Sequence, residues 1–427
     1  MVTGQGFPDE CRIGNLTGLV PDRPGYCGYA MPNNMPNNSV FAGHIQARPL
    51  VETPPAPESP PGVATTTVFK PGEQGYKAFR IPGMLAFKEV LMVFAEGRKY
   101  GCGDFAGQHD IVFKRSTDRG ATWSNFSVLM DPAKMFGDSV CPVANRTTGT
   151  GSCEFWDPTP FADAVTGRVF MMTTRSWPHT VHGSAVDNEA ARMHGLMDCW
   201  LISSDDLGLT WSEPLNITQQ VWSDQWHMMT PANGHAIQSY GNRLLMPGYV
   251  RPGGTDGSSM SAVFYSDDHG VTWSFAPNST IGPGTSESEI VRLQHTPNRL
   301  MFNHRGPGHK RWQSFSDDNG LTWHDFQPAP LLPDPGCKGG IAAWPSKKSL
   351  LFVNAATTHA RVNITLRVSP DDGRSWPVQR LISGPGGYSD VQLATLKGKE
   401  SVCVVFEYDS CTIKVGCIDG EDLLPGQ

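Results

Sequence analysis

The sequence lacks any long stretch with the apolar spacing and capping residues of an amphipathic helix. Charged residues are also scarce, at 18% of 427 residues, whereas glycine and proline number 46 and 35. This composition excludes a helical bundle and favours short strands joined by many turns. Because all-β propellers reach this length as one cooperative unit, a single large domain with an appendage is a reasonable expectation.

Basic clusters and long apolar runs are missing too. The net charge is −7 with no basic run, so we expect neither a nucleic-acid surface nor an anionic-membrane patch, and a few placed cations must hold any anionic ligand. No apolar run approaches the roughly 20 residues of a membrane span. Residues 1–4 lack the charged and apolar regions of a signal peptide.

Metal and cofactor motifs are absent as well. None of the ten cysteines forms a Cys-x2-Cys pair, and the thirteen histidines form no pair of recognised metal-binding spacing. The sequence has no glycine-rich phosphate loop and no Ser-His-Asp order marked by a nucleophile elbow. We therefore predict neither a metal nor a cofactor.

Potential glycan acceptors are numerous. Together with the even number of cysteines, they favour a secreted or lysosomal protein. The seven sequons begin at Asn15, Asn37, Asn125, Asn145, Asn216, Asn278 and Asn363.

The chain changes character near residue 65. Residues 1–65 are rich in proline and asparagine, which disfavour a regular strand or helix, so we expect an irregular N-terminal segment. Cys11 and Cys27 could attach it to itself or to the main body. Residues 66–427 consist of short apolar runs bounded by turn residues, which predicts a single β domain.

One motif, Ser-x-Asp-x-Gly-x-Thr-Trp, occurs five times in this domain. Its Asp carboxylate can accept bonds from turn amides, its glycine supplies a positive φ, and its tryptophan packs beneath the turn, so it is a device of the fold. Ser375 replaces the threonine in the last copy. The copies begin at Ser116, Ser204, Ser266, Ser316 and Ser369.

The spacing of the copies predicts the architecture. They begin 88, 62, 50 and 53 residues apart, and the first gap leaves room for one unit without the motif, around residues 157–176. Six units of four strands would bury their faces by radial stacking, so we predict an all-β fold, a six-bladed β-propeller. Strands at 402–408 and 412–418 would close the ring beside the first blade.

These repeats and the preceding Phe79-Arg80-Ile81-Pro82 make the chain resemble the exo-sialidase (neuraminidase) superfamily, of the Asp-box type found in animals and bacteria. The match covers roughly residues 66–419. The resemblance implies a retaining exo-sialidase that hydrolyses terminal α-linked sialic acids of glycoproteins, glycolipids or oligosaccharides through a tyrosyl-enzyme intermediate.

A sialoside carries a carboxylate on its anomeric carbon, and this anion dictates the residues required. Guanidinium groups suit it because they are permanently charged and offer planar forks of donors. Arg80, Arg305 and Arg361 stand at strand ends and match the family's arginine triad.

A carboxylate nucleophile would be repelled by the substrate's own anion, whereas a phenol would not; sialidases are known exceptions to the two-carboxylate rule. Tyr388 matches the family's nucleophile. Its high pKa requires a neighbouring base, and Glu287 matches the glutamate that accepts the phenolic proton. Glu289 is the nearest competitor, since side chains two apart on a strand point the same way.

The acid/base should lie on a mobile, partly dry loop that can raise its pKa toward the working pH. Asp104 follows a glycine-rich loop, as in the family; Asp110 is the alternative, but it resembles a strand-start residue. The resemblance further assigns Glu407 to orienting the first arginine, and Arg98 with Glu96 to a pair near the sugar's hydroxyls.

Two segments depart from the family pattern. Arg292 stands where Glu is usual after the catalytic glutamate, and residues 230–236 replace a Gly-Pro-Gly segment where specificity loops are expected. Substrate preference therefore stays open: transfer of sialic acid to another sugar and a preference for the deaminated sugar Kdn are alternatives. A non-catalytic, glycan-binding Asp-box propeller is the alternative from another class. The oligomeric state is not predicted.

Overall fold

The computed structural model describes residues 63–104, 107–137, 141, 153–176, 197–223, 225–252, 258–409 and 411–424. The predicted irregular segment therefore lies outside the described residues as far as residue 62, as do Cys11 and Cys27. The sequons at Asn15, Asn37 and Asn145 lie outside them as well.

The described part is all-β, as predicted. Its strands form five hydrogen-bonded sheets. The first contains β1 (Thr65–Phe69), β23 (Ser389–Leu396), β24 (Lys399–Glu407) and β25 (Ile413–Asp419). The second contains β10 (Trp226–Pro231), β11 (Ile237–Gln238), β12 (Leu244–Pro252), β13 (Met260–Ser266) and β14 (Ser274–Phe275).

Two further sheets have four strands each. One contains β15 (Ser288–Arg292), β16 (Leu300–Arg305), β17 (Lys310–Ser316) and β18 (His324–Pro333). The other contains β19 (Gly340–Trp344), β20 (Ser349–Ala355), β21 (Val362–Ser369) and β22 (Val378–Pro385).

The largest sheet has eight strands. They are β2 (Ala78–Phe87), β3 (Val90–Arg98), β4 (His109–Ser116), β5 (Ser127–Met130), β6 (Glu154–Ala162), β7 (Val169–Ser176), β8 (Met197–Ser204) and β9 (Leu215–Asn216). Its halves meet at one parallel pair, His109 with Glu154, while all other pairing in this sheet is antiparallel. Strands β6 and β7 occupy the segment predicted to hold a unit without the repeat motif, but that prediction is wrong. They pair on into β8 and β9, whose connection carries the copy at Ser204, and the sheet without a copy is the one that contains β1 and β23–β25.

Helices are short in the described residues. They are α1 (Pro132–Phe136), α3 (Thr218–Val221) and α4 (Gly420–Leu423), with 3-10 turns η1 (Glu73–Gly75), η2 (Tyr240–Asn242) and η3 (Pro345–Lys347). In this part of the chain no helix has the length and apolarity needed to span a membrane.

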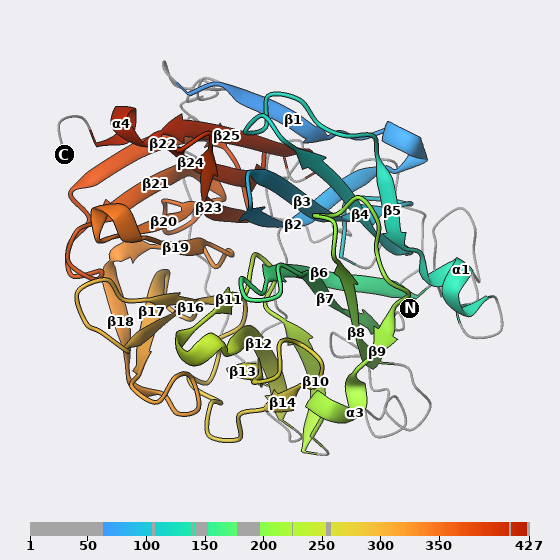
Figure 1. The fold of residues 1–427 in the computed structure, drawn as a ribbon, viewed down its shortest axis with the longest axis horizontal. Helices are drawn as coiled ribbons and strands as arrows, with labels where there is room; N and C mark the ends of the chain where they lie inside the picture. Colours follow the sequence, from blue (N-terminus) through green and yellow to red (C-terminus); the bar gives the residue numbers. More distant parts are fainter. Residues whose placement is uncertain are drawn as a thin grey trace, which may run out of the picture. The chain divides into compact units, whose positions relative to one another are not determined.

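The sheets stand around a common centre in a propeller-like arrangement (Figure 1). An edge strand of one sheet contacts an edge strand of the next, as β15 contacts β19 and β19 contacts β23. Strand β23 in turn contacts β2, and β1 pairs with β25, so strands from both ends of the described chain share one sheet. Strands β24 and β25 lie where the sequence predicted the closing strands.

Apolar side chains fill the spaces between neighbouring sheets. One cluster joins Trp344, Leu351 and Leu366 of the β19–β22 sheet to Val402 and Phe406 of β24. All five are at most 2% exposed, which explains why the strands read as apolar runs.

The five repeat motifs form the same turn. In the first copy the Ser116 hydroxyl accepts the Gly120 N–H at 2.8 Å and donates to Asp118, whose carboxylate accepts the Thr122 N–H at 2.8 Å. Gly120 has a φ of 81°, and the residue before it, Arg119, has a φ of 59°. Because each bond lies within eight residues, the motif specifies the turn locally. The corresponding serine-to-glycine bonds recur at Gly208, Gly270, Gly320 and Gly373.

Three disulfides lie in the described residues: Cys102–Cys411, Cys141–Cys153 and Cys403–Cys417. The first spans 309 residues of sequence and attaches the segment after β3 to the connection between β24 and β25. Cys199 and Cys337 are buried free thiols. Of the sequons, Asn125, Asn216, Asn278 and Asn363 are described, and all four are exposed.

Candidate active site

Tyr388, immediately before β23, is at the centre of the predicted site. Its hydroxyl donates a hydrogen bond to the Glu287 carboxylate, and the Arg305 guanidinium donates to the same hydroxyl at 2.9 Å. Tyr388 and Glu287 are each 6% exposed. Burial raises the pKa of Tyr388 well above its ordinary value, and the Glu287 carboxylate adds to this, whereas Arg305 and Arg361 oppose it. The phenol is therefore protonated at neutral pH, with an acceptor already in place.

The three predicted arginines surround the tyrosine ring. The guanidinium carbons of Arg80, Arg305 and Arg361 lie 5.5, 6.0 and 5.1 Å from its centroid. Arg80 comes from β2, Arg305 ends β16, and Arg361 immediately precedes β21. Three different sheets thus bring three permanent cations to one place, which is suited to a carboxylate ligand.

Asp104 lies beside the first of these arginines. It accepts hydrogen bonds from Arg80 at 2.7 Å and from Arg98 at 2.9 Å, and its side chain is 48% exposed. Burial would raise its pKa, but the two guanidiniums outweigh that effect and hold the pKa well below its ordinary value. The expectation that the loop raises this pKa is therefore wrong for the ligand-free site, because the carboxylate is paired with two arginines.

The alternatives raised by the sequence, Asp110 and Glu289, are bonded to other partners. Asp110 is buried in β4, where it accepts a bond from the Tyr76 hydroxyl at 2.5 Å and pairs with Lys99 at 3.0 Å. Glu289 is bonded to Lys338 and to the backbone N–H of Ile341. Glu287, and not Glu289, is the glutamate that contacts Tyr388.

The three supporting residues lie in contact with this group. Glu407, at the end of β24, accepts bonds from Arg80 Nε at 3.1 Å, from the Ile81 N–H at 3.0 Å and from the Tyr388 N–H at 3.1 Å. It therefore links the first arginine to the tyrosine, and its burial in an apolar strand is satisfied by these donors.

The second pair, Arg98 and Glu96, is fully buried at the end of β3. Arg98 Nη2 donates to Glu96 at 2.7 Å, and its Nη1 also donates to the Cys102 carbonyl at 2.6 Å. Burial raises the pKa of Glu96 to about 7 despite the neighbouring guanidinium. This pair joins the Asp104 loop to the strand that supports it.

Known proteins share this arrangement of sequence and fold. Residues 89–398 match the model of the BNR repeat-like domain. A sialidase of Micromonospora viridifaciens is 29% identical over 377 residues, and one of Bacteroides fragilis is 25% identical over 351 residues. The alignments cover 84% and 79% of this chain, but only 54% and 61% of those proteins.

A solved structure of the Hadza microbial sialidase Hz136 superimposes with a TM-score of 0.73 at 26% identity, covering 84% of this chain and 69% of that one. The chain belongs to the exo-sialidase superfamily, in the BNR repeat-like family. The resemblance inferred from the repeats and from Phe79-Arg80-Ile81-Pro82 is therefore correct.

One residue of this sialidase-family site was not singled out from the sequence. Asp157 in β6 donates its N–H to Glu96 at 3.1 Å, and its carboxylate accepts bonds from Asn233 and Tyr249, each at 3.0 Å. Burial, then the Glu287 and Glu96 carboxylates, raise its pKa to about 8. Like Glu407, Asp157 is an acid beside large apolar residues, and this was the sequence signal that could have identified it.

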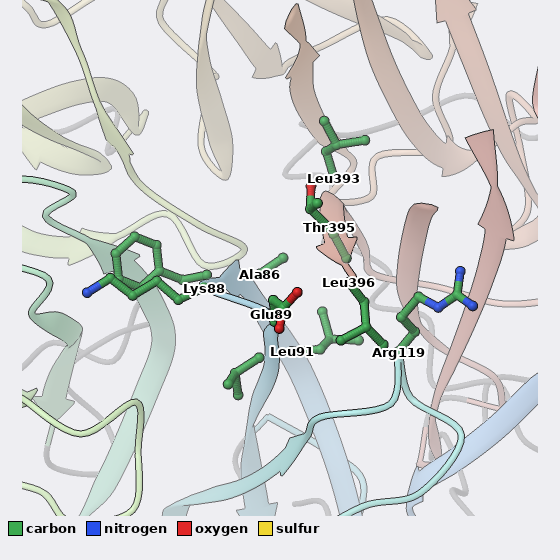
Figure 2. Close-up of a pocket in the computed structure, with 11 residues that line it drawn as sticks. Ala86, Lys88, Glu89, Leu91, Arg119, Leu393, Thr395 and Leu396 are labelled. Carbon is green, nitrogen blue, oxygen red and sulfur yellow. The ribbon is translucent and has the colours of Figure 1, made fainter. Parts of the chain in front are cut away.

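A surface pocket of this sialidase-family chain lies at the other ends of the same strands. It is lined by the β2–β3 turn, with Lys88 and Glu89, and by the end of β23, with Leu393 and Leu396 (Figure 2). Arg80 and Tyr388 stand at the opposite ends of β2 and β23, so the pocket shares no residue with the arginine cluster.

Proposed function

We propose that this chain is a retaining exo-sialidase that hydrolyses terminal α-linked sialic acids of glycoproteins, glycolipids or oligosaccharides. The observation that carries the proposal is the Tyr388 hydroxyl, bonded to Glu287 inside a ring of three arginines. A buried phenol with an adjacent base is an activated nucleophile, and the cations around it suit a substrate that is itself an anion.

Substrate binding begins at the arginines. The sugar carboxylate docks on Arg80, Arg305 and Arg361. It competes with Asp104 for Arg80, because the Arg80 guanidinium donates to the Asp104 carboxylate at 2.7 Å. The added negative charge raises the pKa of Asp104 from its depressed value, because a like charge disfavours the ionised form. Substrate thus prepares Asp104 to carry a proton.

The chemistry then follows in two displacements. Glu287 takes the phenolic proton as the Tyr388 oxygen bonds to C2, while Asp104 gives its proton to the departing oxygen and the glycosidic bond breaks. Asp104 next removes a proton from water, whose oxygen bonds to C2 as the tyrosyl bond breaks, and Glu287 returns the proton to the phenol. Two inversions retain the configuration.

The architecture that we propose for this enzyme has six blades. The eight-stranded sheet consists of two four-stranded groups, β2–β5 and β6–β9, that meet at the single pair His109–Glu154. Counting each group as a blade adds two to the other four sheets. The corresponding domain division is an N-terminal segment, 1–65, and a propeller, 66–427.

The route of the protein is also a proposal. The four described sequons present exposed asparagines, which agrees with a glycoprotein of the secreted or lysosomal route. Mass spectrometry before and after treatment with a peptide N-glycosidase tests this directly. An unchanged mass in protein from its native source would contradict it.

The function is tested by turnover of 4-methylumbelliferyl sialosides that carry an N-acetyl group or a hydroxyl at C5. We expect hydrolysis by the wild type and its loss in Tyr388→Phe and Asp104→Ala. Tyr76→Phe is a matched control, because it also removes a tyrosine hydroxyl bonded to a carboxylate, that of Asp110. Wild-type turnover in both site variants would overturn the mechanism.

The same assay separates the alternatives. The two C5 groups compare sialic acid with Kdn, and a lactose acceptor reveals transfer through a sialylated product. No turnover of either glycoside by the wild type would favour the non-catalytic glycan-binding propeller.

A further inference from the structure

Four buried charged residues lie next to the proposed catalytic pair and take no part in the mechanism above: His235, Glu289, Lys338 and Asp390. Lys338 Nζ donates to Glu289 and lies 3.8 Å from Asp390. His235 Nδ1 lies 2.9 Å from Asp390 Oδ1 and 3.4 Å from Glu289 Oε1. The side chains of all four are at most 5% exposed, so we treat them as one unit, the buried tetrad.

Each acid of the tetrad follows one member of the catalytic pair by two residues. Glu289 follows Glu287 by two residues at the start of β15, and Asp390 follows Tyr388 by two residues at the start of β23. In an extended strand, side chains two residues apart lie on one face. The backbone that fixes each acid is therefore the backbone that places the base or the nucleophile.

The two cations bridge the strands that carry these acids. Lys338, just before β19, bonds Glu289 of β15 and also lies 3.4 Å from the carbonyl of Ser389, the residue after the nucleophile. His235, from the β10–β11 connection, contacts both acids. A lysine and a histidine thus join the start of β15 to the start of β23.

Backbone groups complete the unit. The Ile341 N–H donates to Glu289 at 2.6 Å, and the Met84 N–H of β2, the strand of Arg80, donates to Asp390 at 3.2 Å. Gly340 permits this approach, since a Cβ there would lie 2.7 Å from the Asp390 carboxylate. Edge strands of four sheets, β2, β15, β19 and β23, therefore meet at the tetrad.

The charges of the tetrad balance within a dry environment. Burial lowers the pKa of His235, but Asp390 and Glu289 outweigh it and raise the pKa to about 10, so the ring is charged at neutral pH. Two cations then face two carboxylates. His235, Glu289 and Asp390 could surround a metal ion, but Lys338 already places its ammonium group between Glu289 and Asp390. Removing one partner would leave a buried charge uncompensated.

We propose that Lys338 and His235 are positioning residues. By holding Glu289 and Asp390, they keep the Glu287 carboxylate and the Tyr388 hydroxyl at the distance and orientation that proton transfer requires. The inference rests on the proposed function. A displacement of about 1 Å between reacting groups can cost about 10²-fold in rate. The tetrad acts through the strands, so its loss changes the chemical step more than substrate binding.

The test compares Lys338→Met with Lys114→Met. Lys114 is a matched control because it is also largely buried and paired, with Glu73 and the Val68 carbonyl, away from the site. Two rates are measured in each protein: kcat on an activated sialoside, and covalent trapping by a 2,3-difluorosialic acid. Fluoride leaves C2 without a proton from Asp104, so trapping reports on carboxylate binding and on Glu287 and Tyr388, but not on Asp104.

In Lys338→Met we expect kcat and the trapping rate to fall by about 10²-fold, with KM changed by less than about threefold. Lys114→Met should keep both rates. Lys338→Met/Glu289→Gln removes one charge of each sign and serves if the single variant does not fold; we expect the same loss of both rates. Either variant, folded and trapped as fast as Lys114→Met, would overturn the proposal.

Two remaining outcomes are also decisive. If neither variant folds, the tetrad has a structural role only and the positioning role is wrong. If the wild type is neither trapped nor active on any sialoside, the proposed function fails and this inference with it, a result distinct from variants that keep the full rate.

Discussion

At the scale of single residues, the proposed mechanism first requires that Tyr388 hold its proton until Glu287 removes it. Three guanidiniums around a phenol would by themselves favour the phenolate, but burial and the Glu287 carboxylate raise the pKa of Tyr388 well above its ordinary value. In the proposed mechanism the nucleophile is therefore generated only when Glu287 removes the proton. If Tyr388 were already a phenolate before the substrate bound, it would instead pair with the arginines that the substrate carboxylate needs.

The proposed role of Glu287 as the base predicts the effect of Glu287→Gln. The variant keeps the shape of the side chain and removes the base, so kcat should fall by about 10² to 10⁴-fold. Steady-state kinetics on an activated sialoside checks it. Glu73→Gln, which neutralises the acid paired with Lys114, is the control and should retain activity. A fully active Glu287→Gln would show that another group takes the proton.

Asp157 predicts how stability depends on pH. Its pKa is raised to about 8 in the folded protein, against an ordinary value of about 4, so the folded state binds more protons between these values. The free energy of unfolding therefore falls as pH rises from about 4 through 8. In Asp157→Asn, the decrease in Tm between pH 5 and pH 8 should be smaller, as scanning fluorimetry can measure. An unchanged decrease would contradict this assignment.

At the scale of elements, the segment after β3 carries Asp104 with several attachments. Arg98 holds the Cys102 carbonyl at 2.6 Å, and the Cys102–Cys411 disulfide ties the same residue to the connection before β25. The proposed acid/base thus lies on a loop that is anchored two residues away. Its exposed side chain can exchange partners while the backbone stays in place.

Removing this anchor predicts a loss of rate. In Cys102→Ser/Cys411→Ser, the Asp104 carboxylate samples more positions, and we expect kcat to fall by about tenfold. Cys403→Ser/Cys417→Ser is the control, because that disulfide joins the paired strands β24 and β25; it should lower Tm with little effect on kcat. Equal kcat values for the two double variants would show that the Cys102–Cys411 disulfide does not position Asp104.

At the scale of the whole molecule, sequence predicted what is encoded locally. Each repeat turn is closed by bonds within eight residues, so its form follows from the motif. The arginines and Tyr388 were assigned by their match to the family's motifs, and the chemistry of an anionic substrate agrees with these residue types. By contrast, the tetrad joins residues 49 and 155 positions apart, as in Lys338–Glu289 and His235–Asp390.

Long-range electrostatics explain the other differences. The pKa of Asp104 is lowered by Arg80 of another strand, so the direction could not follow from a glycine-rich loop alone. Asp157 was passed over because its partners, Asn233 and Tyr249, are 76 and 92 residues away. The spacing of the motif predicted six separate units, but it could not show the β4–β6 pair that joins two groups of strands into one sheet.

The pairing of β1 with β25 has a consequence for synthesis. Thr65 pairs with Gly416, so a growing polypeptide presents β1 about 350 residues before the partner strand exists. At about 5 to 20 residues per second, the ribosome needs roughly 20 to 70 s to cover that stretch. Through this interval the edge of β1 is open to foreign strands, and the nascent chain must be shielded until residue 419 has left the exit tunnel.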